Sequence, residues 1–174
     1  MPQEVDGSGL RMESAVMPRR VFDMLERANA PYTVEDHPTV YTAQDLAHVT
    51  HTKGANVIKP VVVRIGTRYI MCAVPAHHRV DLDAVGHAVA ATDPAELVEE
   101  GELDELFPDS DTGAQAPIGE LYGMETLMEE SLHNSPHDVL FQVGSHTQAI
   151  RMAVTDFVQA VNPTLAAISV APSA

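Results

Sequence analysis

A lysine stands at the start of a strongly apolar segment. Residues 57–63 have the sequence Val-Ile-Lys-Pro-Val-Val-Val, so Lys59 occupies a position where a buried strand ordinarily carries an apolar side chain. An ammonium group held there supplies a compact positive charge that can bind a phosphate or stabilise a developing oxyanion. Lys59 is therefore a candidate catalytic residue. The alternative is a strand-edge lysine whose ammonium group simply reaches solvent.

A glycine-containing loop supplies the second candidate. Residues 113–119 have the sequence Gly-Ala-Gln-Ala-Pro-Ile-Gly, which is a GxxxP pattern. Glycine lets the backbone approach a ligand closely, so Gly113 and its neighbours can present N–H groups to a carbonyl oxygen while Pro117 fixes the loop. An ordinary turn is the alternative.

A third group of polar residues lies ahead of a predicted strand. It has the sequence Gly144-Ser145-His146-Thr147 and is followed by the segment 151–157, Arg-Met-Ala-Val-Thr-Asp-Phe. His146 is of a type that can contact an amino group or set the size of a pocket. A histidine that caps the end of a strand is the alternative.

In this order and at these separations, the three pieces resemble the YbaK/EbsC family of prolyl-tRNA-synthetase-associated editing domains. His37 and the segment 42–47, Thr-Ala-Gln-Asp-Leu-Ala, are similar to the N-terminal segment of that family, and the resemblance spans about residues 20–163. It implies a mixed α/β fold in which a β-sheet curls into a partial barrel surrounded by helices. It also implies a free-standing aminoacyl-tRNA deacylase, which acts in trans on the ester between a wrongly attached small amino acid and the tRNA 3′ end.

The resemblance also implies roles for individual residues. In this family the lysine at the position of Lys59 is essential for activity, and Gly113 acts with it. An aminoacyl ester is already activated, so a positioned water can hydrolyse it without a covalent nucleophile. Ala116 and Ile118 stand where the family often has serine and an aromatic residue, which leaves the preferred amino acid open. The implied substrate-binding residues are His37, Thr42, Pro117, Ile118, Gly144, Ser145 and His146.

Charge limits the partners that this chain can bind. Its 174 residues include 10 basic and 25 acidic ones, a formal charge of −15, which opposes undirected binding to nucleic acid or anionic lipid. A tRNA 3′ end needs few phosphate contacts, so weak binding, helped by a partner synthetase, is compatible with rapid turnover. Solvated surface charges are the alternative for the basic residues. Those expected to face tRNA are Lys53, Arg64, Arg68 and Arg79.

Several other chemistries lack their usual residues. The patterns GxSxG, GxGxxG, HExxH and the P-loop are all missing, so the corresponding hydrolases, dinucleotide enzymes and zinc proteases are not indicated. The adjacent His77 and His78 would point to opposite faces of a strand, and we expect neither a metal nor a cofactor. Cys72, the single cysteine, is expected to be a small buried apolar residue. One cysteine, no visible secretory signal and no apolar run of about 18 residues favour a cytoplasmic protein that does not contact a membrane.

Periodicity and capping signals predict the elements that must position these residues. The segments 58–65 and 69–74 are apolar at nearly every position, which predicts a hairpin covered on both faces by helices. Further strands are expected at 32–36, 124–127, 138–143 and 148–152, and helices at 18–28, 42–49, 81–90, 93–106 and 154–161. The expected domain covers residues 18–163, between a flexible N-terminal tail (1–17) and a C-terminal tail (164–174).

Two other functions stay open. A non-catalytic module that binds aminoacyl or nucleotide ends would suit the substituted loop and the acidic balance, and a hydrolase of another small acyl ester would ignore tRNA. The editing function depends on one geometric expectation, which is that Lys59 and the distant Gly113 loop share a cleft. The sequence does not indicate an oligomeric state.

Overall fold

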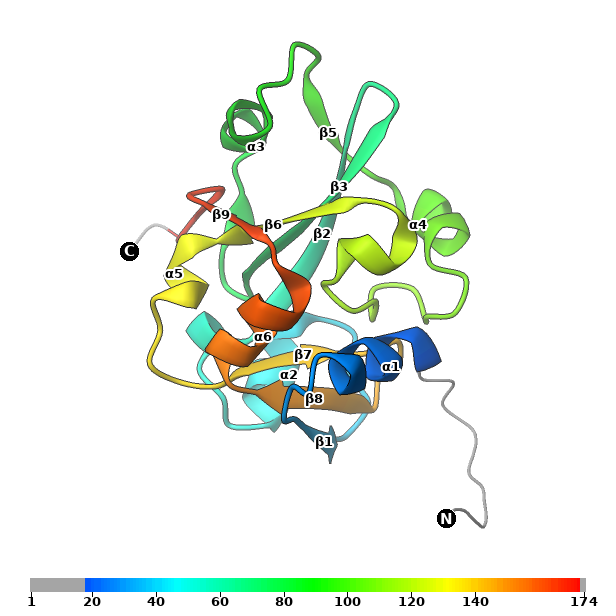
Figure 1. Ribbon diagram of the computed structural model, residues 1–174, viewed down its shortest axis with the longest axis vertical. Helices are drawn as coiled ribbons and strands as arrows, with labels where there is room; N and C mark the ends of the chain where they lie inside the picture. Colours follow the sequence, from blue (N-terminus) through cyan, green and yellow to red (C-terminus); the bar gives the residue numbers. More distant parts are fainter. Residues whose placement is uncertain (1–17, 173–174) are drawn as a thin grey trace.

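A long antiparallel hairpin forms the centre of the computed structural model, which describes residues 18–172 (Figure 1). Strands β2 (Ile58–Ile65) and β3 (Arg68–Pro75) pair along their whole length. Gly66 makes the turn between them with a φ of +60°, a left-handed conformation that glycine adopts without steric cost. The predicted hairpin is confirmed. The tail expected at residues 1–17 lies outside the described residues.

Within residues 18–172 the strands form three sheets, and the hairpin belongs to the largest. The bounds of the other strands are β1 (Thr33–Asp36), β4 (Arg79–Val80), β5 (Ala95–Leu97), β6 (Glu125–Glu129), β7 (Val139–Gln142), β8 (Gln148–Met152), β9 (Thr164–Ala166) and β10 (Ser169–Val170). The largest sheet has the strand order β5-β2-β3-β6-β9, and β6 is parallel to both of its neighbours. The second has the order β1-β8-β7 and lies across the lower end of the molecule in Figure 1. A bridge between Val57 and Leu140 links these two sheets, and β10 pairs with β4 in the third.

Helices cover both faces of the hairpin, as the apolar strands predicted. The helices are α1 (Arg19–Arg27), α2 (Ala43–Val49), α3 (Leu82–Ala88), α4 (Glu100–Leu106), α5 (Glu130–His133) and α6 (Val154–Val161), with short 3-10 helices η2 (Gly54–Asn56) and η3 (Gly119–Tyr122). Val85 of α3 packs with Val63 and Cys72 on one face. Leu103 of α4 packs with Met71 on the other face.

The three-stranded sheet is also covered on both faces, which explains why every residue of β7 is buried. Phe141 packs with Leu25 of α1 and Phe157 of α6, and the two phenylalanine rings lie 5.3 Å apart. Leu140 packs on the opposite face with Leu46 of α2. Successive side chains of a strand alternate between faces, so α1 with α6 and α2 cover the two sides.

Side-chain caps account for two helix starts, whereas α1 begins after Pro18, whose carbonyl accepts from the Val21 N–H group. The Thr42 hydroxyl accepts a hydrogen bond from the Asp45 N–H group at 3.0 Å, which caps α2. The Asp81 carboxylate does the same for α3 by accepting from the Ala84 N–H group. These caps satisfy backbone donors that a helix leaves unpaired at its first turn.

The predicted helix over 93–106 is wrong in its first part. Ala95–Leu97 form strand β5, and the helix begins only at Glu100. The three residues pair antiparallel with Val63–Ile65 at the edge of β2. Pairing with an otherwise unpartnered strand edge outweighs the local capping pattern at Asp93 and Pro94, because sheet hydrogen bonds come with burial of the strand face.

The segment 164–174, expected as a C-terminal tail, contains two strands up to Val170. β9 pairs with β6, and Ile168 is completely buried. The nearly buried Glu129 carboxylate accepts hydrogen bonds from the N–H groups of Ile168 and Ser169 and from the Ser169 hydroxyl. A buried charge needs such partners, so this segment and the end of β6 stabilise each other.

The molecule has the predicted mixed α/β class, with helices around its sheets. The sheets curl past one another but are not closed into a barrel. Within residues 18–172, no helix is both long enough and apolar enough to cross a membrane.

Replacing Glu129 tests the attachment of the C-terminal segment. We expect Glu129→Ala to lower the free energy of unfolding by about 3 kcal/mol, because four donors, including the Ser131 N–H group at the start of α5, lose their acceptor in a buried place. Urea denaturation measures this loss. The matched control is Glu130→Ala at an exposed neighbour, which should change the free energy of unfolding by about 0.5 kcal/mol or less. Equal effects of the two substitutions would contradict this account.

Candidate functional site

Lys59 is half-buried on β2, opposite Val74 of β3. Its ammonium group donates a hydrogen bond to the backbone carbonyl of His78. Burial lowers the pKa of Lys59 below its ordinary value, because the charged form loses hydration. The ammonium group is therefore held in place by a backbone acceptor while it has no carboxylate partner among the described residues.

His78, whose carbonyl accepts the hydrogen bond from Lys59, also contacts the C-terminal strand β10 through its side chain. The Nδ1 atom of His78 lies 2.7 Å from the Ser169 hydroxyl oxygen, and that hydroxyl donates to Glu129. A hydroxyl has one proton, so the Ser169 oxygen must accept from a protonated Nδ1. Burial, then the neighbouring His77 and Lys59, lowers the pKa of His78 despite an opposing effect of Glu129. The ring is therefore neutral at pH 7 and keeps its Nε2 as an acceptor.

Lys59 and Gly113 line the same cavity, as the sequence predicted. This cavity, called here the inner cavity, has a volume of about 220 Å³. Segments far apart in the chain build it: the start of α2, the start of β2, the Gly113 loop and the end of β7. Its lining residues are Tyr41, Thr42, Ala43, Leu46, Ile58, Lys59, Pro60, Gly113 and Gln142.

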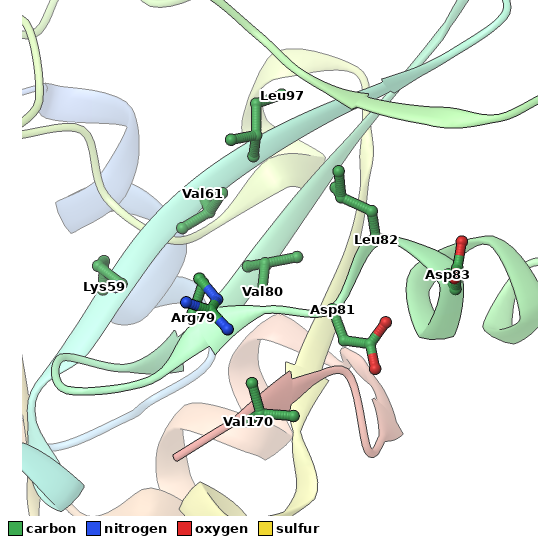
Figure 2. Close-up of a pocket in the computed structure, with 9 residues that line it drawn as sticks. All are labelled: Lys59, Val61, Arg79, Val80, Asp81, Leu82, Asp83, Leu97 and Val170. Carbon is green, nitrogen blue, oxygen red and sulfur yellow. The ribbon is translucent and has the colours of Figure 1, made fainter. Parts of the chain in front are cut away.

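A larger groove begins on the other side of Lys59. This outer groove has a volume of about 680 Å³ and is lined by Lys59, Val61, Arg79, Val80, Asp81, Leu82, Asp83, Leu97 and Val170. In the view of Figure 2, Leu97 and Val170 lie at opposite ends of the groove, with Val80 between them. Lys59 therefore borders both spaces.

The edge of β2 beside these spaces has no strand partner over residues 58–61 in the part of the chain that the structure describes, and the Val62 carbonyl accepts from the Val98 N–H group just after β5. β5 pairs only with Val63–Ile65, and Val57 forms its single bridge with Leu140. Pro60 lies in this gap, where its missing N–H group removes no sheet hydrogen bond. A ligand can therefore approach the backbone of β2 at Lys59.

The Gly113 loop exposes its glycine and buries the rest. Gly113 has a φ of +85°, which favours glycine, and no atom lies within 4 Å of where a Cβ would be. Ala114, Ala116 and Ile118 are completely buried. Gly113 is thus the part of the loop that faces the inner cavity, on a support anchored in the core.

Hydrogen bonds fix the Gly113 loop to the Gly144 loop. The Gly144 N–H group donates to the Ala114 carbonyl at 2.6 Å, and the Gly144 carbonyl accepts from the Asp111 N–H group at 2.9 Å. Gly144 has a φ of +94°, and a Cβ there would lie 2.4 Å from the Cδ atom of Pro18. Only glycine fits between this proline and the loop.

The predicted substrate-binding residues fall into two groups. Thr42 lines the inner cavity, with its hydroxyl engaged in capping α2. The ring of His146 packs against that of Tyr41, a lining residue that is 70% exposed, at 4.8 Å between centroids. The His37 N–H group donates to the Thr147 carbonyl, which holds the approach to Tyr41 beside the His146 loop. Of these three predicted residues, Thr42 lines the cavity and His146 contacts the lining residue Tyr41.

The other predicted substrate-binding residues are buried away from the cavity lining. Pro117 and Ile118 are buried, and Ile118 belongs to the main core. The Ser145 hydroxyl pairs with that of Thr147 inside its own turn. Pro117, Ile118, Gly144 and Ser145 therefore support the loops rather than line the cavity.

The structure does not gather the basic residues into one surface. Arg79 shares the outer groove with Lys59. Arg64 pairs with Glu102 at 2.8 Å and with Glu96 at 3.3 Å, and Arg68 pairs with Glu125 at 2.7 Å. Lys53 lines a separate polar cavity with Arg151. Carboxylate partners offset the charges of Arg64 and Arg68, so Arg79 is the one of these four residues that lines a space together with Lys59.

Two lining residues, Tyr41 and Gln142, were missed in the sequence. Gln142 could have been found by the signal that indicated Lys59, since it is a polar residue in the apolar segment 139–143. Tyr41 precedes the cap of α2 and carries no comparable signal. Among residues 18–172, no group of three His, Cys, Asp or Glu side chains could hold a metal ion. Burial raises the pKa of Cys72 to about 12, so its thiol stays protonated at neutral pH.

Solved structures with the same fold exist. The crystal structure of a proposed trans-editing enzyme for prolyl-tRNA synthetase has a TM-score of 0.74 and 20% identity, and the match covers 87% of this chain and 96% of that one. The crystal structure of a hypothetical protein has a TM-score of 0.78 and 14% identity, with 87% and 99% covered. At such identities the likeness shows the fold alone. No curated protein matches this sequence.

The family is shown by the sequence itself. The sequence profile described as "Aminoacyl-tRNA editing domain" matches residues 37–160, which is most of the chain. The match includes Lys59, the Gly113 loop and the Gly144 loop, the three pieces that the fold brings together. This chain therefore belongs to the family of aminoacyl-tRNA editing domains.

Proposed function

We propose that this protein is an aminoacyl-tRNA deacylase that acts in trans and hydrolyses the ester of a tRNA carrying a wrong, small amino acid. The observation that carries the proposal is that Lys59 and Gly113 line one small cavity at an unpaired strand edge, with a larger groove on the far side of Lys59. This arrangement has room for two chemically different parts of one substrate.

Volume divides the substrate between the two spaces. The inner cavity, at about 220 Å³, is the smaller of the two spaces, so we assign the small aminoacyl group to it. The outer groove, at about 680 Å³, has room for a terminal nucleoside. Its aliphatic side chains offer a surface for a flat base, and its charged side chains offer partners for polar groups. The ester bond between the two parts then lies at Lys59.

The reaction needs only a positioned water. Its oxygen attacks the acyl carbon, and the bond between that carbon and the ribose oxygen breaks, which releases a free amino acid and a tRNA hydroxyl group. The Lys59 ammonium and the N–H group of the exposed Gly113 stabilise the oxyanion that forms on the acyl oxygen. No thiol takes part, because Cys72 is buried and protonated.

Removing the Lys59 ammonium tests its role. We expect Lys59→Ala to lower kcat/KM for a mischarged tRNA at least about 100-fold, the usual loss when one oxyanion donor is removed. Deacylation of radiolabelled aminoacyl-tRNA measures this. The control is Arg27→Ala, which removes an exposed cation at the end of α1 and should leave the rate unchanged. A wild-type protein that binds aminoacyl-tRNA without turnover would instead show a non-catalytic binding module.

The pH dependence follows from the direction of the Lys59 pKa. The charge is present below the lowered pKa and is lost above it, so kcat/KM should fall with rising pH before the ordinary value of 10.5 is reached. Rates must be corrected for spontaneous ester hydrolysis. In Lys59→Arg the guanidinium stays charged, so any activity that remains should show no such fall. A wild-type profile that stays flat up to 10.5 would contradict the role of the ammonium group.

Arg79 provides a test of tRNA binding. We expect Arg79→Ala to raise KM and to reduce the slope of log(kcat/KM) against log salt by about one, because one phosphate contact is lost. Arg27→Ala again serves as the control.

Addition of a cognate synthetase should lower KM if that partner supplies the missing positive surface. An unaided enzyme whose rate is insensitive to salt would exclude this dependence.

A further inference from the structure

Gln142 presents an unsatisfied amide at the inner cavity. The residue is 5% exposed, and its Nε2 atom is buried with no hydrogen-bond partner among residues 18–172. A buried N–H donor without an acceptor is destabilising, and most such groups in native proteins are paired. Gln142 also lines the cavity that contains Lys59 and Gly113. We therefore infer that a bound ligand supplies the hydrogen-bond partner of this amide.

Strand geometry directs this amide toward the cavity. Gln142 follows Leu140 by two residues on β7, so both side chains point to the face covered by α2. The start of α2 supplies Thr42 and Leu46 to the same cavity. The opposite face of β7 is filled by Phe141 and the main core.

The exposure of three lining residues distinguishes the solvent-facing end of the inner cavity from its buried end. Gly113 is exposed, Lys59 is half-buried and Gln142 is buried. A tRNA body must stay outside, so its ester reaches Gly113 and Lys59 at the mouth while the acyl side chain points inward. The group that meets Gln142 is therefore the end of the amino-acid side chain.

Chemistry then selects the side chain. The surrounding walls include Ala43, Leu46, Ile58 and Pro60, and the Thr42 hydroxyl is already engaged. An amide offers both a donor and an acceptor, and a hydroxyl group can satisfy either one. A methyl group would leave the amide unpaired. The α-ammonium group of the substrate has no acceptor to offer to the Nε2 donor.

We propose that Gln142 is a specificity-determining residue that selects aminoacyl groups with a short hydroxyl-bearing side chain, of the seryl and threonyl class, over alanyl. The inference rests on the proposed function. Sites built to hydrogen-bond a substrate hydroxyl discriminate strongly against analogues that lack it, because their own polar groups are then left unpaired.

The test compares one tRNA charged with serine or with alanine. The wild-type protein should hydrolyse the seryl ester with a kcat/KM roughly 10- to 100-fold above that of the alanyl ester, the range that one unpaired buried donor produces. Gln142→Met keeps the length and removes the amide. It should reduce the preference to about threefold or less, chiefly through loss of seryl hydrolysis. Gln142→Leu provides a second apolar variant if the first fails to fold.

Controls separate specificity from stability. Gln148→Met makes the same substitution on β8, where the side chain donates to Asp36 outside the cavity, and it should keep the wild-type preference. Gln142→Met should melt at or above the wild-type temperature, because an unpaired buried amide is replaced by an apolar group of similar shape.

The outcomes also separate this inference from the proposed function. Wild-type hydrolysis of both esters within threefold, a preference for alanyl, or an equal loss of both activities in Gln142→Met would overturn the role of Gln142 and leave the deacylase standing. Absence of hydrolysis of any aminoacyl-tRNA would overturn the deacylase, and the role of Gln142 with it.

Discussion

The unpaired edge of β2 is the constraint on which the candidate site depends. A strand in the middle of a sheet is normally paired on both sides, and a ligand cannot reach its backbone. Here β5 pairs with one end of β2 and the bridge to Leu140 lies just before the other end, so the stretch at Lys59 and Pro60 stays open. Pro60 suits this place because it has no N–H group to leave unsatisfied. The same gap lets one lysine border two spaces of different size.

Two glycines with positive φ angles have different roles beside the inner cavity: Gly144 supports the loop that contains Gly113, and Gly113 lines the cavity. Gly144 fits against Pro18 and is hydrogen-bonded to the loop that contains Gly113. The first glycine is needed for packing, whereas nothing crowds the second, which is free to face a ligand. Glycines with similar backbone conformations thus serve different purposes, and only their surroundings distinguish a support from a ligand-facing residue.

The parts of the fold that local signals specify were predictable from the sequence. The hairpin follows from its apolar segments, and α2 and α3 follow from the caps at Thr42 and Asp81. Long-range pairing was not predictable. The strand at Ala95–Leu97 forms because it pairs with an edge of β2. The C-terminal segment that contains β9 and β10 is ordered by the pairing of β9 with β6 and by hydrogen bonds to Glu129. Neither cause is visible in the short segments themselves.

The candidate site divides in the same way. Lys59 and Gly113 were predicted together because unusual residues in a defined order indicated them, and the structure places them in one cavity. The pairing of Arg64 and Arg68 with carboxylates was not predictable, because it depends on α4, β5 and β6 lying beside the hairpin. The burial of Ile118 in the core was also not predictable, because a GxxxP pattern does not indicate which of its side chains face inward.

Modification of the single cysteine can report local unfolding of the central hairpin. Cys72 lies in the middle of β3 and has no exposed surface. It pairs with Val61, which follows Lys59 by two residues on β2. A thiol-modifying reagent reaches it only when the hairpin separates from its covering helices. The labelling rate of the unmodified sequence therefore follows local unfolding beside the site, without any engineered probe, and ligands that fill the two spaces at Lys59 should slow that labelling.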